Sequence, residues 1–160
     1  MATVDDVRGR NDPEIAMSFR ETLGAQHRAC DARLVEAERA VQRGDWAAAT
    51  QRAQRFVDDT EAHFGFEELT LFPALAEAQP GAAAPIDVMR SEHKQLRELF
   101  AQFRDALDQR DANGVAEAVD IILLLLQQHN AKEENVLYPI ADQVLSHERL
   151  IGKGLEKEQM

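Results

Sequence analysis

The chain has 160 residues, 44% of them hydrophobic, which suits a single domain with a full apolar core. A formal net charge of -11 argues against nucleic acid or an anionic membrane as a partner, because both need a basic surface. The single cysteine, Cys30, excludes a disulfide within the chain. Because the N-terminus is polar and the longest apolar run, Ile121 to Leu126, is far shorter than the roughly 20 residues of a membrane span, we expect a soluble cytoplasmic protein.

The first helix is predicted to begin at Asp12-Pro13, where an acidic cap is followed by a proline at the first helical position. Residues 1–11 before it show no periodicity and are expected to form a flexible leader. Apolar residues then recur at helical spacing as far as Val41, and His27 lies in the middle of this stripe. His27 is therefore expected to face inward.

A second helix is predicted directly after the first, because Gly44 is a helix terminator and Asp45 a helix cap. So short a connection makes the two helices an antiparallel hairpin. The inward stripe of the second helix includes His63 and Glu67. Pro73 is expected to kink or end this helix, leaving a short helical remnant after it.

The second hairpin is predicted to follow the proline- and alanine-rich loop 80–85. Its third helix carries His93 on the inward stripe, and its fourth, capped by Asp111, carries His129 and Glu133. The fourth helix is also apolar on other faces within 121–126, which indicates either deeper burial, the interpretation we favour, or a dimer surface.

The end of the bundle is predicted from Pro139, which should kink or end the fourth helix as Pro73 does the second. We therefore expect a four-helix domain over 12–146 and a short C-terminal helix or frayed tail over 147–160.

An internal repeat relates the two hairpins. The pattern H-x-x-x-E-E-x-x-L-[F/Y]-P occurs at 63–73 and returns 66 residues later at 129–139, and the same offset places His27 over His93. A histidine and a glutamate four residues apart share one helix face. Each half therefore brings two histidines and one glutamate to the same place.

These side chains are predicted to meet in an up-down-up-down four-helix bundle built from two repeated helical hairpins. His27 lies 17 residues before Gly44 and His63 lies 19 after it, so the two are level across the first hairpin. His93 and His129 are level across the second hairpin by the same count. Facing helices build metal sites in the cores of such bundles. The predicted site comprises His27, His63, Glu67, His93, His129 and Glu133.

The alternative to a metal site is that each histidine is a hydrogen-bonded core residue. Four buried imidazoles and two buried carboxylates at one level would be costly without a cation, so we favour metal binding. Carboxylates with imidazoles and no thiolate favour iron, manganese or cobalt over a structural zinc. Two glutamates in bridging positions indicate two ions.

This arrangement of residues resembles the hemerythrin-like, or HHE cation-binding, family over roughly residues 15–145. The resemblance implies a four-helix bundle with a non-haem di-iron centre bridged by an oxo or hydroxo group. By the same resemblance, His27 and His63 would hold one iron and His93 and His129 the other. Glu67 and Glu133 would bridge the two irons. Members of the family include oxygen carriers, oxygen or redox sensors, iron-repair proteins and enzymes that consume peroxide or nitric oxide.

One departure from the oxygen carriers bears on activity. Those proteins have a fifth histidine one turn away on the third helix, where this chain has Met89 and Arg97 around His93. The irons would then keep open positions, which favours reaction with oxygen, peroxide or nitric oxide. The alternative is a reversible oxygen-binding or sensing module, or iron storage or repair, without turnover. Manganese, cobalt or zinc are possible substitutes for iron, and the protein is expected to be a monomer or homodimer.

Three neighbours of the expected centre have open roles. Glu68 and Glu134 follow the bridging acids and could support the ligands, act as ligands or be solvated. Tyr138 takes the place of Phe72 in the repeat, so we favour a core-packing ring over a redox-active or proton-donating phenol.

Overall fold

The computed structural model describes residues 17–147 and 149–152. Within these ranges the chain is helical apart from short turns and contains no strand, which confirms the all-α prediction. The helical elements are α3 (Phe19–Gln42), α4 (Trp46–Phe66), the π-helix η1 (Glu67–Leu71), α5 (Phe72–Ala78), the 3₁₀ turn η2 (Pro80–Ala82), α6 (Ala83–Asp108), α7 (Ala112–Lys132), the π-helix η3 (Glu133–Leu137) and α8 (Tyr138–Val144).

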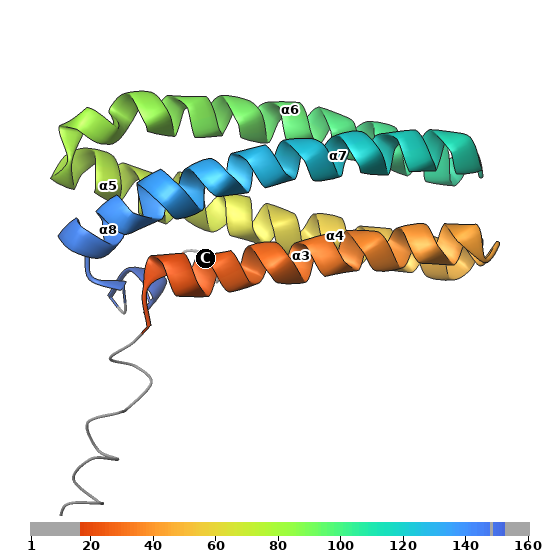
Figure 1. Ribbon diagram of the computed structural model, residues 1–160, viewed down its shortest axis with the longest axis horizontal. Helices are drawn as coiled ribbons and strands as arrows, with labels where there is room; N and C mark the ends of the chain where they lie inside the picture. The colour runs from red at the N-terminus through yellow and green to blue at the C-terminus, as the bar shows by residue number, and fades with distance from the viewer. Residues whose placement is uncertain (1–16, 148, 153–160) are drawn as a thin grey trace, which may run out of the picture.

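The long helices form two hairpins, α3 with α4 and α6 with α7, whose turns lie at the same end of the molecule (Figure 1). The hairpins pack against each other through contacts of α3 with α7 and of α4 with α6. The short helices α5 and α8 lie at the end away from the turns (Figure 1). In the described part of the chain, no helix has the length and apolar character needed to cross a membrane.

The helix that carries His27, α3, begins at Phe19 rather than at the predicted Asp12-Pro13, because Met17 and Ser18 are not helical. Ser18 is extended, and its hydroxyl accepts a hydrogen bond from the backbone of Glu21. The carboxylate of Asp142, on α8, accepts another from the Phe19 N–H at 2.6 Å. Both acceptors satisfy N–H groups that the first turn of a helix leaves free.

Several predicted boundaries lie outside the described residues, namely the leader 1–11, the helix start at Asp12-Pro13 and the end of the tail from residue 153. The segment 147–152 is helical at each of its described residues, as the short C-terminal helix requires.

The two hairpin turns repeat one design. Gly44 (φ 76°) and Arg110 (φ 53°) both adopt the left-handed conformation that commonly ends a helix. Asp45 and Asp111 follow them, and each side chain accepts a hydrogen bond from the backbone N–H three residues on. The predicted turns and caps are therefore both present.

The helical backbone does not end at either proline, and the short helix that the sequence predicts after Pro73 is present as α5. Pro73 and Pro139 each lie just after a π-helical turn, and the backbone continues as α5 and α8. A proline donates no hydrogen bond, so Pro73 leaves the carbonyl of Glu68 without its π-helical partner. The Arg90 guanidinium donates to this carbonyl at 3.2 Å.

The π turns also shift which residues face inward. Val136 and Ile140 continue the α-helical spacing of His129 and Glu133, but Val136 is 48% exposed and Ile140 is only half-buried. Leu137 and Tyr138 are buried instead. A π-helix brings residues five apart, rather than four, onto one face, so the stripe moves by one position after Glu133.

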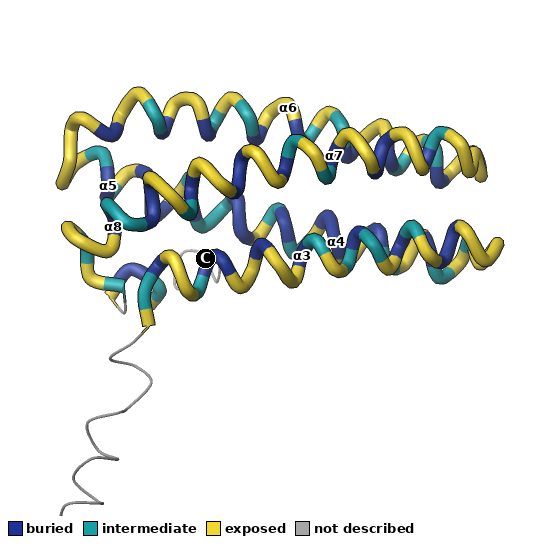
Figure 2. Tube along the Cα trace, in the orientation of Figure 1, coloured by how far each residue is buried: buried dark blue, intermediate teal, exposed yellow. Residues whose placement is uncertain are grey.

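The apolar core is divided into two clusters with a polar layer between them. Near the hairpin turns the cluster includes Leu34, Phe56 and Phe103, and at the other end it includes Phe19 and Phe72. The buried positions follow the inner faces of the helices (Figure 2). The predicted metal-binding residues lie in the layer between the clusters.

The outer face of α7 shows that our preference for deeper burial was wrong at two positions. Ile121 and Leu124 are 48% and 55% exposed, whereas Ile122 and Leu126 are buried. Among the long helices of the described chain, α7 packs mainly against α3 and α6.

Candidate metal centre

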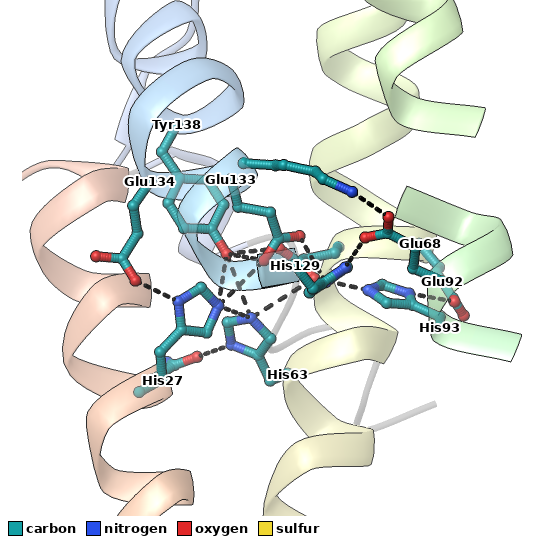
Figure 3. Close-up of polar contacts among 12 residues, drawn as sticks. His27, His63, Glu68, Glu92, His93, His129, Glu133, Glu134 and Tyr138 are labelled. Carbon is teal, nitrogen blue, oxygen red and sulfur yellow. Dashed lines mark hydrogen bonds and ion pairs between the residues drawn. The ribbon is translucent and has the colours of Figure 1, made fainter. Parts of the chain in front are cut away.

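The six predicted residues converge from all four long helices. His27, His63, His93 and His129 come from α3, α4, α6 and α7, and Glu67 and Glu133 begin the two π-helical segments. All six side chains are buried, with at most 5% of any residue exposed. Figure 3 shows the four imidazoles and Glu133 pointing toward one another.

Each glutamate lies between the two histidine pairs. Oε1 of Glu67 is 3.5 Å from Nε2 of His63 and 3.2 Å from Nε2 of His93. Oε1 of Glu133 is 3.1 Å from Nε2 of His27, and its Oε2 is 3.4 Å from Nε2 of His129. The carboxylates are thus positioned to be shared by two ions.

The outer nitrogen of every histidine is already engaged. The Nδ1 atoms pair as His27 with Glu134 (2.8 Å), His63 with Gln26 (2.7 Å), His93 with Glu68 (2.7 Å) and His129 with Glu92 (2.9 Å). Because carboxylate and amide oxygens only accept hydrogen bonds, Nδ1 carries the proton in each ring. Nε2 is then the nitrogen of each ring that faces the centre and can bind an ion in place of a proton, as in histidines that bind metals.

These partners settle one open question and add two residues that the sequence analysis missed. Glu68 and Glu134 orient His93 and His27, and neither belongs to the inner group of ligand atoms. Gln26 and Glu92 were not predicted. A signal for them was present, since each directly precedes a histidine of the repeat and the two are 66 residues apart.

Charged groups fix some of the outer partners. Arg97 donates to both oxygens of Glu68 at 3.1 Å and also to Glu61. Burial opposes ionisation of Glu68, but Arg97 and His93 outweigh it and lower the pKa of its carboxyl group. An ion pair with Lys132 likewise holds Glu92 and contributes to lowering the pKa of its carboxyl group against the effect of burial.

Tyr138 reaches the centre with its hydroxyl group. The ring is buried, as expected, but the hydroxyl lies 2.6 Å from Oε2 of Glu67 and 2.9 Å from Oε1 of Glu133. It is also within 3.3 Å of Nε2 of His27 and His63. The favoured interpretation of pure core packing was therefore incomplete. Burial, and then the two carboxylates, raise the pKa of Tyr138 well above its usual value, so the phenol is a protonated donor.

The histidines and glutamates of the centre shift one another's pKa values. Burial disfavours charged imidazoles, but Glu67 and Glu133 outweigh it and raise the pKa of His63 to about 10. The same carboxylates and Glu92 raise the pKa of His129 to about 9 against the effect of burial. The pKa of Glu133 lies well below its usual value despite burial, because Glu67 and the histidines lower it. The cluster therefore attracts positive charge.

The donor set fits a pair of metal ions. Nε2 of His93 and of His129, Oε1 of Glu67 and Oε2 of Glu133 are buried without a hydrogen-bond partner in the described structure. Nε2 atoms of His27 and His63 lie 3.0 Å apart, the separation of two ligands at right angles and about 2.1 Å from one ion. Two sets of four ligand atoms each lie within 4.8 Å of one another, namely His27, His63, Glu67 and Glu133, and Glu67, His93, His129 and Glu133.

Fold and site together define a helical metal-binding domain. Residues 18–141 match the model of the hemerythrin HHE cation binding domain. The chain belongs to this family, as the sequence pattern indicated. No curated protein and no solved structure matches the chain.

Proposed function

We propose that the four long helices α3, α4, α6 and α7 form an up-down-up-down bundle that holds a non-haem di-iron centre reactive toward peroxide, oxygen or nitric oxide. His27 and His63 bind one iron, His93 and His129 bind the other, and Glu67 and Glu133 bridge them. The observation that carries this proposal is the position of each buried carboxylate between the two histidine pairs. A single-ion site would need no such sharing.

Iron is preferred because the donors are imidazoles and carboxylates without a thiolate, a set that also accepts manganese, cobalt or zinc. When bound, the two irons supply the one-electron redox chemistry that the side chains lack. The chain supplies the ligands, their orientation and a site enclosed by apolar clusters.

Helix α6 offers no further ligand beside His93. Met89 is buried in the apolar cluster away from the hairpin turns, and Arg97 is directed to Glu61 and Glu68. With two histidines and two shared carboxylates for each ion, open positions remain for a small molecule. This favours reaction over reversible oxygen storage.

Tyr138 gives the centre a proton donor beside both bridging carboxylates. A neutral phenol there can hold a proton close to a reacting oxygen atom, which supports chemistry that converts peroxide to water. Disproportionation turns two molecules of hydrogen peroxide into two of water and one of dioxygen, so it needs no other reductant. We propose peroxide consumption as the activity.

The test compares the wild type with His129→Ala at equal protein concentration, after loading both with iron. Gln127→Ala is the control, because Gln127 is exposed on the same helix. The wild type and the control should contain iron and consume peroxide, whereas His129→Ala should do neither. A reversible oxygenated spectrum in the wild type, with no peroxide loss above that of His129→Ala, would instead support the oxygen carrier.

A further inference from the structure

A surface groove of about 390 Å³ lies between α3 and α4 beside the His63 edge of the centre, and Ile151 of the C-terminal segment also lines it. Ala29 and Ala62 are among its lining residues, and both are exposed. Gln26, also exposed, lines the groove as well, and so do the buried residues Cys30 and His63. The groove therefore extends from solvent to a residue of the metal cluster.

The repeat provides an internal comparison, because the corresponding place between α6 and α7 is almost closed. The cavity there is about 30 Å³. Gln95 and Gln128 replace Ala29 and Ala62, and Leu96 replaces Cys30. Larger side chains in the second half thus occupy space that is open in the first.

A second cavity of about 10 Å³, named the internal cavity here because nearly all of its lining residues are buried, adjoins the groove. It shares Cys30 and His63 with the groove and is also lined by His27, Thr60 and Asn130. These two residues therefore form the wall between the open groove and a space that touches both histidines of one pair.

This internal cavity also depends on the difference between the halves. Asn130 corresponds in the repeat to Phe64, and Thr60 corresponds to Leu126. The Phe64 ring stacks on His93, with centroids 3.8 Å apart and planes 15° apart. An aromatic ring therefore covers the histidine of the second half, whereas the equivalent position beside His27 carries a smaller amide.

The internal cavity suits a small polar molecule. Its volume is close to the 10–15 Å³ that one water-sized molecule requires. Oδ1 of Asp31 and Oγ1 of Thr60 belong to lining residues and are buried without a hydrogen-bond partner among the described residues. Unpartnered polar atoms favour a molecule that can hydrogen-bond over an apolar one.

His63, which forms part of this wall, has a weaker outer hydrogen bond than His129, its counterpart in the second half of the repeat. His63 donates to the neutral amide of Gln26, whereas His129 donates to Glu92, which is itself paired with Lys132. Hydrogen bonds to charged acceptors are roughly twice as strong as those between neutral groups. The outer hydrogen bond of His63 is therefore the weaker of the two.

We propose that the α3–α4 groove is the entrance through which hydrogen peroxide, a small uncharged polar molecule, reaches the centre beside His27 and His63. This inference rests on the proposed function for its substrate and on the two cavities for its path. On the α6–α7 side the cavity is lined by none of the four histidines, so it does not lead to the centre. Peroxide passes between Cys30 and His63 into the internal cavity, and the side chain of Gln26, which lines the groove, moves aside.

The test places the larger side chains of the second half at the equivalent positions of the open groove. In the double variant Ala29→Gln/Ala62→Gln, the groove receives the residue types found in the second half. The control Gln95→Ala/Gln128→Ala makes the reverse change at the closed side. Both pairs are exposed on helices, so neither change disturbs the core.

One readout is peroxide consumption by the iron-loaded protein. The other is the rate at which methyl methanethiosulfonate modifies Cys30, followed by mass spectrometry in metal-free and loaded protein.

We expect the glutamine pair to slow both peroxide loss and Cys30 modification several-fold with no change in iron content. The alanine pair should change neither, because Leu96 and the Phe64 ring over His93 still separate that side from the centre. Peroxide loss that is equally fast with the groove filled would overturn the entrance. If the wild type consumed no peroxide, the proposed function would fail. Unchanged Cys30 modification in the glutamine pair would separately refute the groove as a path inward.

Discussion

Nδ1 of His27 donates a 2.8 Å hydrogen bond to Oε2 of Glu134, although the two residues are 107 positions apart in the chain. The same relationship joins His93 to Glu68 in the other half of the repeat. Each bond fixes the proton on Nδ1 and directs Nε2 to the centre. The second glutamate of each E-E pair therefore supports a histidine of the opposite hairpin.

The Glu134→Ala variant should bind metal more weakly, by about 10–100-fold, because an oriented histidine loses its outer partner. Metal affinity measured by competition with a chelator would show this. Asn135→Ala, an exposed change at the next position, is the control and should bind as the wild type does. Equal affinities for all three proteins would mean that Glu134 has no role in the centre.

Gly24→Ala tests how Glu134 reaches His27. A Cβ at Gly24 would lie 3.3 Å from Oε1 of Glu134, so the carboxylate must shift, whereas a Cβ at Gly65 would meet nothing within 4 Å. Both glycines lie in helices, where alanine is favoured by up to about 1 kcal/mol. We expect weaker metal binding in Gly24→Ala but not in Gly65→Ala, without loss of thermal stability in either. A large fall in the thermal stability of Gly24→Ala would indicate a packing defect instead.

Tyr138→Phe removes the hydroxyl and keeps the ring, which is the residue type found at position 72 in the repeat. Without it the buried carboxylates of Glu67 and Glu133 lose a donor, so the free energy of unfolding of the metal-free protein should fall by about 1–3 kcal/mol. Denaturant titration measures this change. Unchanged stability would mean that the hydroxyl of Tyr138 contributes nothing to the fold and that only its ring, through packing, does.

The stability of the metal-free protein should depend on pH through His63. Its pKa is about 10 in the folded chain and 6.5 in the unfolded one, so protonated His63 stabilises the fold fully below about pH 6.5. This contribution is lost as the pH rises through 10. The melting temperature should therefore fall from pH 7 to pH 10 in the wild type and fall less in His63→Gln. Parallel curves would show that another group controls this range.

Metal loading should weaken that dependence, because an ion replaces the proton on Nε2 of His63. Loading at pH 7 should accordingly release protons, which a weakly buffered titration with a pH indicator detects. Loading without proton release would contradict protonated histidines in the metal-free centre.

Much of this site could be predicted from local periodicity. His63 and Glu67 are four residues apart on an α-helix, and the repeat supplies their counterparts, so the inner six residues were predicted correctly as a buried cluster. The hairpin turns followed from Gly44 and Asp45 for the same reason. These features depend on residues close in sequence or related by the repeat.

What the sequence did not show depends on the π turns and on contacts between hairpins. Because the spacing changes from four to five after Glu133, the hydroxyl of Tyr138 reaches the centre and Val136 does not. The partners of Nδ1 come from other helices, which periodicity within one helix cannot identify. The groove depends on side-chain volume at positions such as Ala62, which the repeat alone could have revealed.

The most direct test of the central claim, that six buried side chains hold two shared ions, is the iron content of the purified iron-replete protein, measured by elemental analysis against protein concentration. The account predicts about two irons per chain, because each carboxylate lies between two histidine pairs. A content of at most one ion per chain, after loading with excess iron, would contradict it.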